Sequence, residues 1–336
     1  MNAAARVARR LVASALVVWF ALTVAFAIHY ALPGDPARAL AGPQARPADV
    51  KRLRAQLGLD RPLAAQYALF FRRAVHRGEP TIARGDREHA GCVAFGRAHV
   101  DLGYSLQRRK PVVALVLERW PASLLLAACA LAVQVLAGSA AGLTAALARG
   151  GRLDHGAIAA TLLGVSVPPY LLGLGLQYLL AYRLRWVPLD GYGETWGERL
   201  AHVALPALTL GAYGAALYAR LVRDAVRTHL RLDHVRAAFA RGGSRARVIG
   251  FHVLRNASLP LVALVGLDAG ALMAGALVTE KLFRWPGLGQ LTVDAVLDRD
   301  GPVVLGCVLA GSIAVVAANL AADAAKALLD PRLRRP

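Results

Sequence analysis

Asp268 is the only Asp, Glu, Lys or Arg inside the long apolar stretches of this 336-residue chain. A carboxylate near the middle of a bilayer costs about 2.5 to 3.5 kcal/mol on insertion scales, so it usually faces protein or water. Asp268 could line a solute path and balance a cationic group there. It could equally make a helix–helix hydrogen bond or stay protonated, and the sequence leaves both interpretations open.

No arrangement of residues in the sequence supports catalysis. No lysine stands in a Gly-Lys-Ser/Thr sequence, so there is no P-loop, and there is no HExxH. A lone intramembrane aspartate cannot form the carboxylate pair of an aspartic protease. Residues 242–246, Gly-Gly-Ser-Arg-Ala, approach a nucleophile elbow but lack its last glycine and a preceding strand. We expect no enzyme activity and no cofactor, so any ATP hydrolysis must come from a partner.

Histidines and cysteines do not suggest a metal or disulfide site. His229 and His234 are poorly spaced for one helical face and have no third ligand nearby, which favours solvated side chains and no metal. The three cysteines, Cys92, Cys129 and Cys307, form no disulfide framework.

Composition places the chain in a membrane. Hydrophobic residues make up 57% of it, which is too apolar for a soluble domain of this length. Six stretches reach the roughly 20 residues needed to cross a bilayer. They cover residues 11–31, 120–148, 156–182, 200–219, 256–279 and 301–322. The first is longer than the core of about 7 to 15 residues in a signal peptide, so we expect it to be retained. The predicted fold class is an all-α membrane protein with six transmembrane helices.

Basic residues predict the orientation. The net charge of +19 could indicate nucleic acid, but the arginines lie in blocks between apolar stretches, without a nucleic-acid-binding motif. If both termini are cytoplasmic, the segments on the inside hold most of the positive charge of the short loops, as the positive-inside rule requires. The inner residues are Arg6, Arg9, Arg10, Arg149, Arg152, the nine arginines from Arg220 to Arg255, Lys326, Arg332, Arg334 and Arg335. The outer loops hold Arg183, Arg185, Arg199, Lys281, Arg284 and Arg299.

This orientation divides the chain into four parts. Residues 1–31 form the cytoplasmic N-terminus and first span, and residues 32–119 an extracytoplasmic segment. Residues 120–325 form the core, with a basic cytoplasmic loop at 223–255, and residues 326–336 a cytoplasmic tail.

The extracytoplasmic segment is predicted to be long and mainly helical. Helical patterns at 49–57 and 63–75 are separated by Gly-Leu-Asp-Arg-Pro. Residues 79–100 are rich in charge and glycine and are predicted to be an exposed loop. Residues 111–119 should form a short amphipathic helix that leads into the second span and lies at the membrane interface.

Prolines and glycines within the spans predict bends and close helix packing. Pro168 and Pro169 fall in the middle of the third stretch and Pro206 in the fourth, where each should bend its helix. Such kinks can bound a solute path or be merely structural. Two pairs of small residues, Gly138 with Gly142 and Gly266 with Gly270, permit close helix packing. Residues 280–289 predict a polar turn with aromatic side chains at interface level.

The segment 228–260 predicts a basic helical hairpin between two spans. Asp233 can cap a helix of about eight residues, and Gly242 can take the left-handed position that ends it. Leu232, Val235 and Phe239 fall on one side, with arginines around the others, so this amphipathic helix could seat in a groove on another protein. A second helix should start at a Ser244 cap and return to the membrane.

The residues Arg236-Ala237-Ala238-Phe239-Ala240-Arg241-Gly242, followed by Leu259-Pro260, resemble the "EAA" loop of bacterial ABC-importer permeases of the dipeptide, oligopeptide and nickel branch. Arg236 replaces the glutamate of the general motif, a departure common in the peptide branch. Other family-like motifs follow in order. They are LPGDP at 32–36, LGLDRPLAAQY at 57–67, DLGYS at 101–105, EKLFRWPGLG at 280–289 and DPR at 330–332. Only residues 79–100 depart from the family pattern, by their length.

The resemblance implies a type I ABC importer permease fold in the bacterial inner membrane. Its coupling helix, with Arg236, Ala237, Ala238, Phe239, Arg241 and Gly242, would dock in a cleft of an ATPase subunit. The implied partners are a homologous second permease, two cytoplasmic ATPases, an extracytoplasmic binding protein and membrane lipid, with no nucleic acid. Asp268, Pro168 and Pro169 would be candidates for a translocation path for peptides.

A stand-alone secondary transporter or channel is the alternative. Its spans should carry several polar residues and perhaps inverted repeats, whereas this chain offers one aspartate and no convincing repeat. Copurification with ATPase subunits would discriminate. The sequence does not define the solute, because the family also handles nickel, glutathione and sugars.

Overall fold

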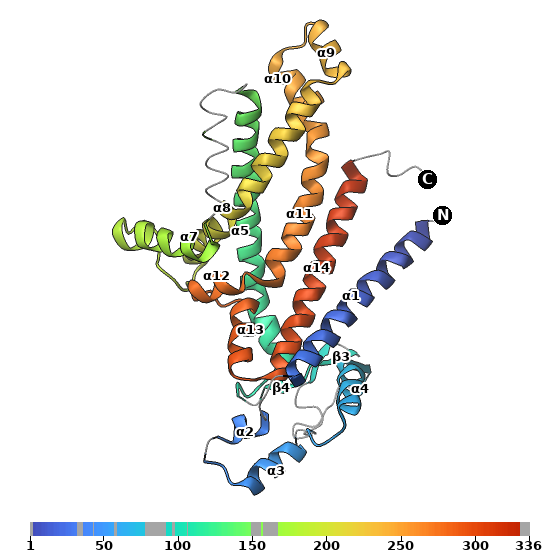
Figure 1. Ribbon diagram of the computed structural model, residues 1–336, viewed down its shortest axis with the longest axis vertical. Helices are drawn as coiled ribbons and strands as arrows, with labels where there is room; N and C mark the ends of the chain where they lie inside the picture. Colours follow the sequence, from blue (N-terminus) through green and yellow to red (C-terminus); the bar gives the residue numbers. More distant parts are fainter. Residues whose placement is uncertain are drawn as a thin grey trace. The chain divides into compact units, whose positions relative to one another are not determined.

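The computed structural model describes residues 3–31, 36–42, 44–56, 59–77, 92–95, 98–105, 107–148, 156 and 167–329 (Figure 1). Unit 1 comprises Met1–Ala122 and Pro286–Ile313, and unit 2 comprises Ser123–Trp285 and Ala314–Pro336. Most of the LPGDP motif, residues 79–91 and the DPR motif lie outside the described residues.

Several helices are long and apolar enough to cross a membrane, as predicted. They are Ala8–Ile28 within α1 (Ala3–Ala31), α5 (Val112–Leu147), α8 (Trp196–Leu230) and Gly301–Leu328 within α14 (Gly301–Leu329). A fifth candidate is a bent pair, Arg245–Ser258 and Pro260–Met273, at 47° to each other. This pair comprises α10 (Arg245–Arg247), η3 (Val248–Leu254) and α11 (Arg255–Gly275). Much of the predicted third stretch lies outside the described residues, so the count of six stays a prediction.

Unit 1 contains β-strands, so the expectation of an all-α chain is wrong here. Helices α2 (Pro36–Ala41), α3 (Pro47–Gln56) and α4 (Leu63–Ala74) precede an antiparallel sheet of order β1-β3-β2. Its strands are β1 (Val75–Arg77), β2 (Cys92–Phe95) and β3 (Ala98–Asp101), and β4 (Tyr104–Ser105) pairs separately with β5 (Lys110–Pro111). Part of the predicted exposed loop is therefore sheet. The sequence pattern missed these strands for two reasons. Strands of two to four residues are too short to show the alternation of period two, and β3 pairs with β1 across a long sequence separation.

The core of unit 1 joins α5, α13 (Leu288–Leu297) and α14. Its buried members are Leu102, Val112, Val113, Leu115, Val116, Leu288, Leu291, Ala295, Val303, Cys307 and Ala310. The short helix predicted at 111–119 is continuous with the second span, because both belong to α5, which continues through Pro121. Val112, Val113 and Val116 are buried against this core, which makes the segment part of a packed helix and not a surface element.

Aromatic contacts attach α4 to α1 within unit 1. The hydroxyls of Thr23 and Tyr67 are 2.7 Å apart, and the Tyr67 ring lies edge-on to Phe26 with centroids 5.2 Å apart. Tyr67 also contacts Phe71 on its own helix, at 4.9 Å between centroids. The predicted pattern at 63–75 is thus confirmed as a helix, and its aromatic face packs on the first span.

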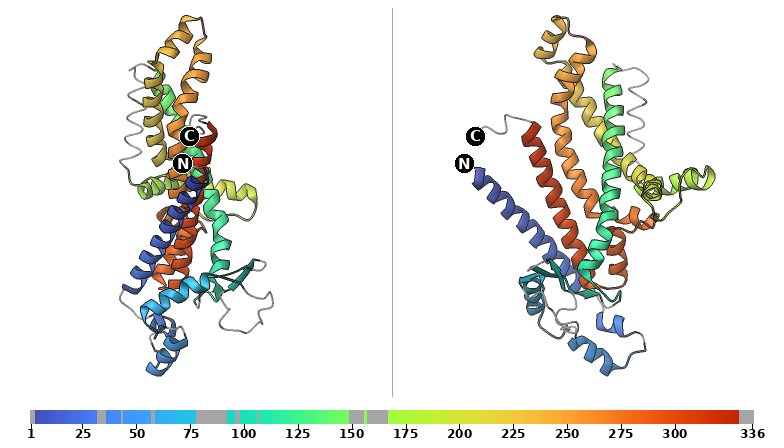
Figure 2. Two further views of the ribbon diagram at one scale, coloured as in Figure 1. Left: turned by 90° about the vertical axis from the view of Figure 1, so that its right-hand side faces the viewer. Right: turned by 180° about the vertical axis from the view of Figure 1, so that it is seen from behind.

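Unit 2 is organised around a hairpin of α8 and α11, which pack against each other. Figures 1 and 2 show the two helices side by side, with the short α9 (Asp233–Ala240) at their connected end. Glycines bring neighbouring helices close, as expected. A Cβ on Gly138 of α5 would lie 2.5 Å from the Tyr218 Cβ of α8, and one on Gly266 of α11 would lie 2.0 Å from the Ala322 Cβ of α14.

The corner after α11 is buried within the protein, and its place at the level of the membrane interface stays a prediction. Glu280 on α12 (Leu277–Leu282), Phe283 and Trp285 are only 2%, 1% and 0% exposed. Ser123 of α5 donates to the Glu280 carboxylate at 2.8 Å, and the Tyr192 ring packs edge-on against Trp285 at 4.8 Å. The hydrogen bond from Ser123 offsets part of the cost of burying this carboxylate.

Pro168 and Pro169 begin a helix, whereas the sequence predicted that they would bend one. Pro168 occupies the N-cap of α7 (Pro169–Leu176), which continues into η2 (Gln177–Arg183). Proline is favoured at the first helical position because its missing N–H would have had no partner there. Pro206, by contrast, lies inside α8, and the bend expected there stays a prediction.

Candidate functional site

The predicted basic hairpin forms, and α9 has the expected length of eight residues. The N-cap is Leu232 and not Asp233, which instead lies in the first turn, where its charge still favours the positive end of the helix. Gly242 has φ +81°, which confirms the predicted left-handed stop. The Gly243 N–H bonds to the Ala238 carbonyl at 3.1 Å, completing a Schellman motif.

One valine anchors α9 on the hairpin. Val235 is fully buried and belongs to a cluster that draws on α5, α8, η3 and α11. The other buried members are Ala146, Val222, Val226, Val248, Val253 and Ala257. Burying a valine contributes about 1.5 to 3 kcal/mol, which is enough to seat a two-turn helix at this position. Movement of α9 therefore has to involve both long helices of the hairpin.

The opposite side of α9 remains exposed. Leu232 and Phe239 are 40% and 39% exposed, so the apolar stripe predicted from the sequence is split between the interior and the surface. Arg236 and Arg241 are exposed as well. We call Leu232, Arg236, Phe239, Arg241 and Gly242 the α9 surface. Its combination of two large apolar side chains and two arginines suits a protein partner with an apolar cleft and acidic groups.

Gly243 is a residue that the sequence pattern did not single out. A Cβ at this position would lie 2.8 Å from both the Ala238 carbonyl oxygen and the Val248 Cγ2. At Gly242 an added Cβ would meet nothing within 4 Å, so only its backbone conformation requires glycine. The Gly-Gly pair was visible in the sequence, but glycine is required at the two positions for different physical reasons.

Asp268 lies on α11 and is partly buried. Its carboxyl interacts with the phenol of Tyr218 on α8. Tyr218 is fully buried, and its hydroxyl makes no hydrogen bond of ordinary geometry among the described residues. Sequence reasoning missed Tyr218 because nothing local distinguishes it from the other tyrosines. Pro168 and Pro169 start α7, which packs on α8 and α12.

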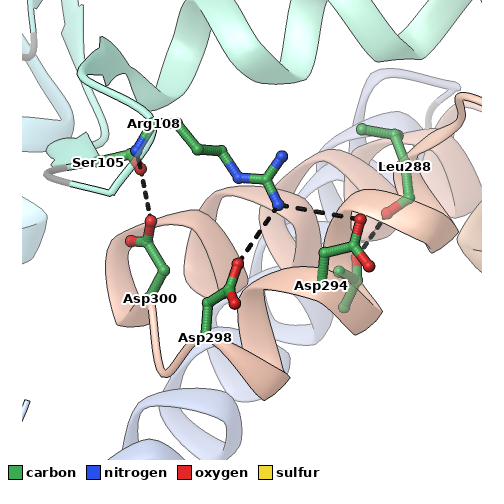
Figure 3. Close-up of polar contacts among 7 residues, drawn as sticks. Ser105, Arg108, Leu288, Asp294, Asp298 and Asp300 are labelled. Carbon is green, nitrogen blue, oxygen red and sulfur yellow. Dashed lines mark hydrogen bonds and ion pairs between the residues drawn. The ribbon is translucent and has the colours of Figure 1, made fainter. Parts of the chain in front are cut away.

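A polar network holds the DLGYS motif in unit 1 (Figure 3). Ser105 donates to the Asp300 carboxylate at 2.5 Å, and Arg108 reaches Asp294 at 3.9 Å and Asp298 at 3.7 Å. Burial raises the pKa of Asp300 more than the hydrogen bonds from Ser105 and the Val303 amide lower it. The network ties the β4–β5 turn to α13 and to the residues between α13 and α14. The motif was recognised in the sequence, but its partners were not.

The two histidines beside α9 have separate surroundings. The His229 Nδ1 lies 2.8 Å from the Ala225 carbonyl oxygen of its own helix, and His234 is exposed. In the described part of the chain, no group of three His, Cys, Asp or Glu residues is arranged to hold a metal ion.

Two family models match the chain. One describes a binding-protein-dependent transport system inner membrane component and matches residues 138–335. The other, for the N-terminal part of the same membrane component, matches residues 5–127.

Curated relatives match over almost the full length. A candidate peptide permease of Brucella suis is 36% identical over 94% of both chains. The dipeptide transport system permease of Escherichia coli is 34% identical over 92% of both, and a glutathione transport system permease of the same species is 35% identical over 98% of both.

A chain of the methionine ABC transporter MetNI, solved in an inward-facing conformation, has a TM-score of 0.52 at 18% identity, covering 66% of this chain and 98% of that one. This last likeness concerns the fold alone.

Proposed function

The chain belongs to the family of inner-membrane components of binding-protein-dependent transport systems, and on this premise we propose that it is the permease subunit of an ATP-driven importer of di- or oligopeptides. The proposal of a peptide solute rests on the dipeptide, peptide and glutathione permeases that resemble it. A shared element of these solutes is a small peptide with a free amino group.

The α9 surface is the proposed docking element for the ATPase subunits. The observation that carries this role is a short helix whose Val235 is buried in the hairpin while Arg236, Phe239 and Arg241 remain free for a partner. Arg236, Ala237, Ala238, Phe239, Arg241 and Gly242 are the proposed coupling residues. Closure of the ATPases would push α9, and the push would pass through Val235 into α8 and α11.

Closure of the ATPases can shift the permease between its two transport states only if the ATPases bind α9 with a different affinity in each state. With α9 anchored to both long helices of the hairpin, that difference would tilt the hairpin as one piece. The permease would then alternate between openings towards the two sides of the membrane.

The proposed assembly contains a homologous second permease, two ATPases on the cytoplasmic side and an extracytoplasmic binding protein. Both termini and the loop 223–255 would be cytoplasmic, and residues 32–119 extracytoplasmic. The core would be residues 120–325 with six membrane spans. The excess of basic residues in the segments assigned to the inside supports this orientation.

Asp268 is the proposed path residue, with Pro168 and Pro169 as further candidates. A carboxylate in an otherwise apolar set of spans can balance the ammonium group of a peptide. Pro168 is exposed at the start of α7 and could form part of the same path.

Coexpression with neighbouring reading frames tests the proposal. We expect tagged permease to copurify with P-loop ATPases, and the reconstituted complex to accumulate tritiated dialanine or glutathione in an ATP-dependent manner. Gly242→Asp should leave the protein inserted but uncouple uptake from ATP hydrolysis, because it adds a side chain with a negative charge to the α9 surface, at a left-handed position that favours glycine. Uptake without any ATPase, or normal coupling in this variant, would contradict the proposal.

A further inference from the structure

The end of α5 that packs beside α9 carries a polar contact that the proposed coupling route does not use. Arg227 of α8 donates from its Nη2 to the Ala145 carbonyl oxygen of α5 at 3.2 Å. Because α5 ends at Leu147, this oxygen belongs to the last four carbonyls of the helix, where helical N–H partners run out. A guanidinium is also favoured there by the negative end of the helix dipole. Arg227 therefore holds the end of α5.

The same end of α5 belongs to the cluster that anchors α9. Ala146, the chain neighbour of Ala145, shares this cluster with Val226, the chain neighbour of Arg227, and with Val235 of α9. The side chains of the three cluster residues are at most 4% exposed. The hydrogen bond thus joins α5 to α8 at the place where a displacement of α9 enters the protein.

The remaining contacts between α5 and α8 leave a specific task for this hydrogen bond. A Cβ on Gly142 of α5 would lie 2.4 Å from the Ala219 carbonyl oxygen of α8, so the two backbones approach closely here. A glycine has no side chain that would stop α5 from shifting along α8, and packed helices can slide in this way. The Nε2 of Gln134 donates to the Leu210 carbonyl at 3.3 Å, but this contact lies nearer to the middle of α5. Arg227 fixes the register of the two helices at the end beside α9.

We propose that Arg227 is a positioning residue for coupling, which holds the end of α5 to α8 so that the push of an ATPase on α9 moves α5 together with the hairpin. This rests on the proposed function, since it takes α9 as the docking element. Without the hydrogen bond the push would still reach α8 and α11, but part of the movement would be lost as sliding between α5 and α8. Arg227 acts through α5 and need not touch the ATPase or the solute.

The test compares Arg227→Met with Arg220→Met in the complete complex. Arg220 is exposed on the same helix, so its variant controls for the loss of one positive charge from α8. Methionine and arginine have similar helix propensities, so neither change should disturb α8 itself. Arg227→Lys is the rescue variant, because a bond from one nitrogen to one carbonyl needs a charged donor and not the planar fork of arginine.

The first readout is the distance between spin labels at Thr144→Cys on α5 and His234→Cys on α9, which are both exposed positions. It is measured by pulsed electron paramagnetic resonance in a complex whose native cysteines are replaced, without ATP and after trapping with ATP and vanadate. With Arg227 in place, the mean distance should be the same in both states, because α5 moves with α9. The two states should differ in Arg227→Met and agree in Arg220→Met.

The second readout is the amount of tritiated dialanine or glutathione transported per ATP hydrolysed in proteoliposomes. Arg227→Met should lower this ratio roughly two- to thirty-fold, the range in which substitutions along a coupling route act. Arg220→Met should leave the ratio unchanged, and Arg227→Lys should keep it close to that of the wild type. A purely structural defect lowers uptake and ATP hydrolysis together and leaves the ratio unchanged.

The outcomes separate this inference from the proposed function. A label distance that differs between the two states with Arg227 in place shows that α5 does not follow α9, and it overturns the inference. An unchanged distance or an unchanged ratio in Arg227→Met overturns it as well, and so does a ratio in Arg227→Lys as low as in Arg227→Met. In each case the permease assignment stands if the wild-type complex couples uptake to ATP hydrolysis. A wild-type complex without ATP-dependent uptake removes the proposed function itself, and the inference with it.

Discussion

At the level of single residues, the end of α9 depends on two glycines with different requirements. Gly242 needs its backbone conformation, and Gly243 needs the absence of a side chain, because Ala238 and Val248 leave no room for one. The Schellman motif joins them by placing the Gly243 N–H on the Ala238 carbonyl. The direction in which α9 leaves the hairpin is therefore determined by contacts that allow little variation.

Gly243→Ala should weaken coupling. The new Cβ would press on a backbone oxygen, and overpacking of this kind costs about 1 to 3 kcal/mol. Gly250→Ala is the matched control, since an added Cβ there meets nothing within 4 Å. Uptake per ATP hydrolysed should fall in the first variant and not in the second. Equal ratios in the two variants would contradict the packing argument.

Asp300 should make the stability of the protein depend on pH. Its pKa is raised by burial in the folded state, so the folded state holds the proton more tightly than the unfolded chain. Its contribution is therefore most favourable below the ordinary Asp pKa of about 3.9 and is lost as the pH rises through the raised value.

Asp300→Asn tests this pH dependence, because the amide oxygen can still accept from Ser105. The melting temperature of wild type relative to Asp300→Asn, measured in detergent, should fall as the pH increases from about 4 towards neutrality. A difference that is constant with pH would argue against burial as the dominant cause.

At the level of elements, α8 is stabilised at its start by a capping box. The Thr195 hydroxyl accepts from the Glu198 N–H at 3.3 Å, and the Glu198 carboxylate accepts from the Thr195 N–H at 3.4 Å. Both interactions satisfy amides that no helical carbonyl can reach. The residues Thr-x-x-Glu carried this signal in the sequence, although the apolar stretch that predicted the span begins only at residue 200.

Thr195→Ala should lower the free energy of unfolding by about 0.5 to 2 kcal/mol, the usual cost of losing an N-cap side chain. Thr195→Ser retains the hydroxyl and serves as the control. Thermal melting of the two variants under one set of conditions provides the measurement. Similar melting temperatures would mean that the cap contributes nothing to the stability of the folded chain.

The α5–α8 pair gives a second prediction at this scale. Gly142→Ala should disrupt helix packing and reduce the yield of folded protein, since the Cβ would lie 2.4 Å from a backbone oxygen of the other helix. Gly175→Ala in α7 meets no neighbour within 4 Å and should be neutral or slightly stabilising. Monodisperse protein recovered from membranes distinguishes the two. Equal recovery would show that α5 can move to make room.

At the level of the whole molecule, membrane orientation is the property from which the coupling mechanism follows. The α9 surface can meet an ATPase only if it lies on the cytoplasmic side. The same topology would put the loop after η2, including the 73% exposed Trp186, on the opposite side. Basic residues support this arrangement through the positive-inside rule.

Cysteine labelling measures the orientation. After replacement of Cys92, Cys129 and Cys307, a membrane-impermeant maleimide should label Trp186→Cys in intact cells. Phe239→Cys should be labelled only after permeabilisation, and incubation with the ATPase subunits should then protect it. Labelling of Phe239→Cys in intact cells would place α9 outside and contradict the proposed coupling mechanism.

The sequence alone determined the features that depend on short-range patterns. Apolar stretches predicted the long helices, Gly242 predicted the end of α9, and the linked motifs predicted the family. These predictions succeeded because helix ends and spans are encoded within a few neighbouring residues.

Only the tertiary structure decided which distant segments meet. It paired β3 with β1 and β2, extended α5 through Pro121, and buried Glu280 and Trp285 in the corner after α11. The physical reason is that the burial of a side chain and its partners depend on contacts between residues far apart in the chain. Packing determines those contacts, and the identity of either residue alone does not.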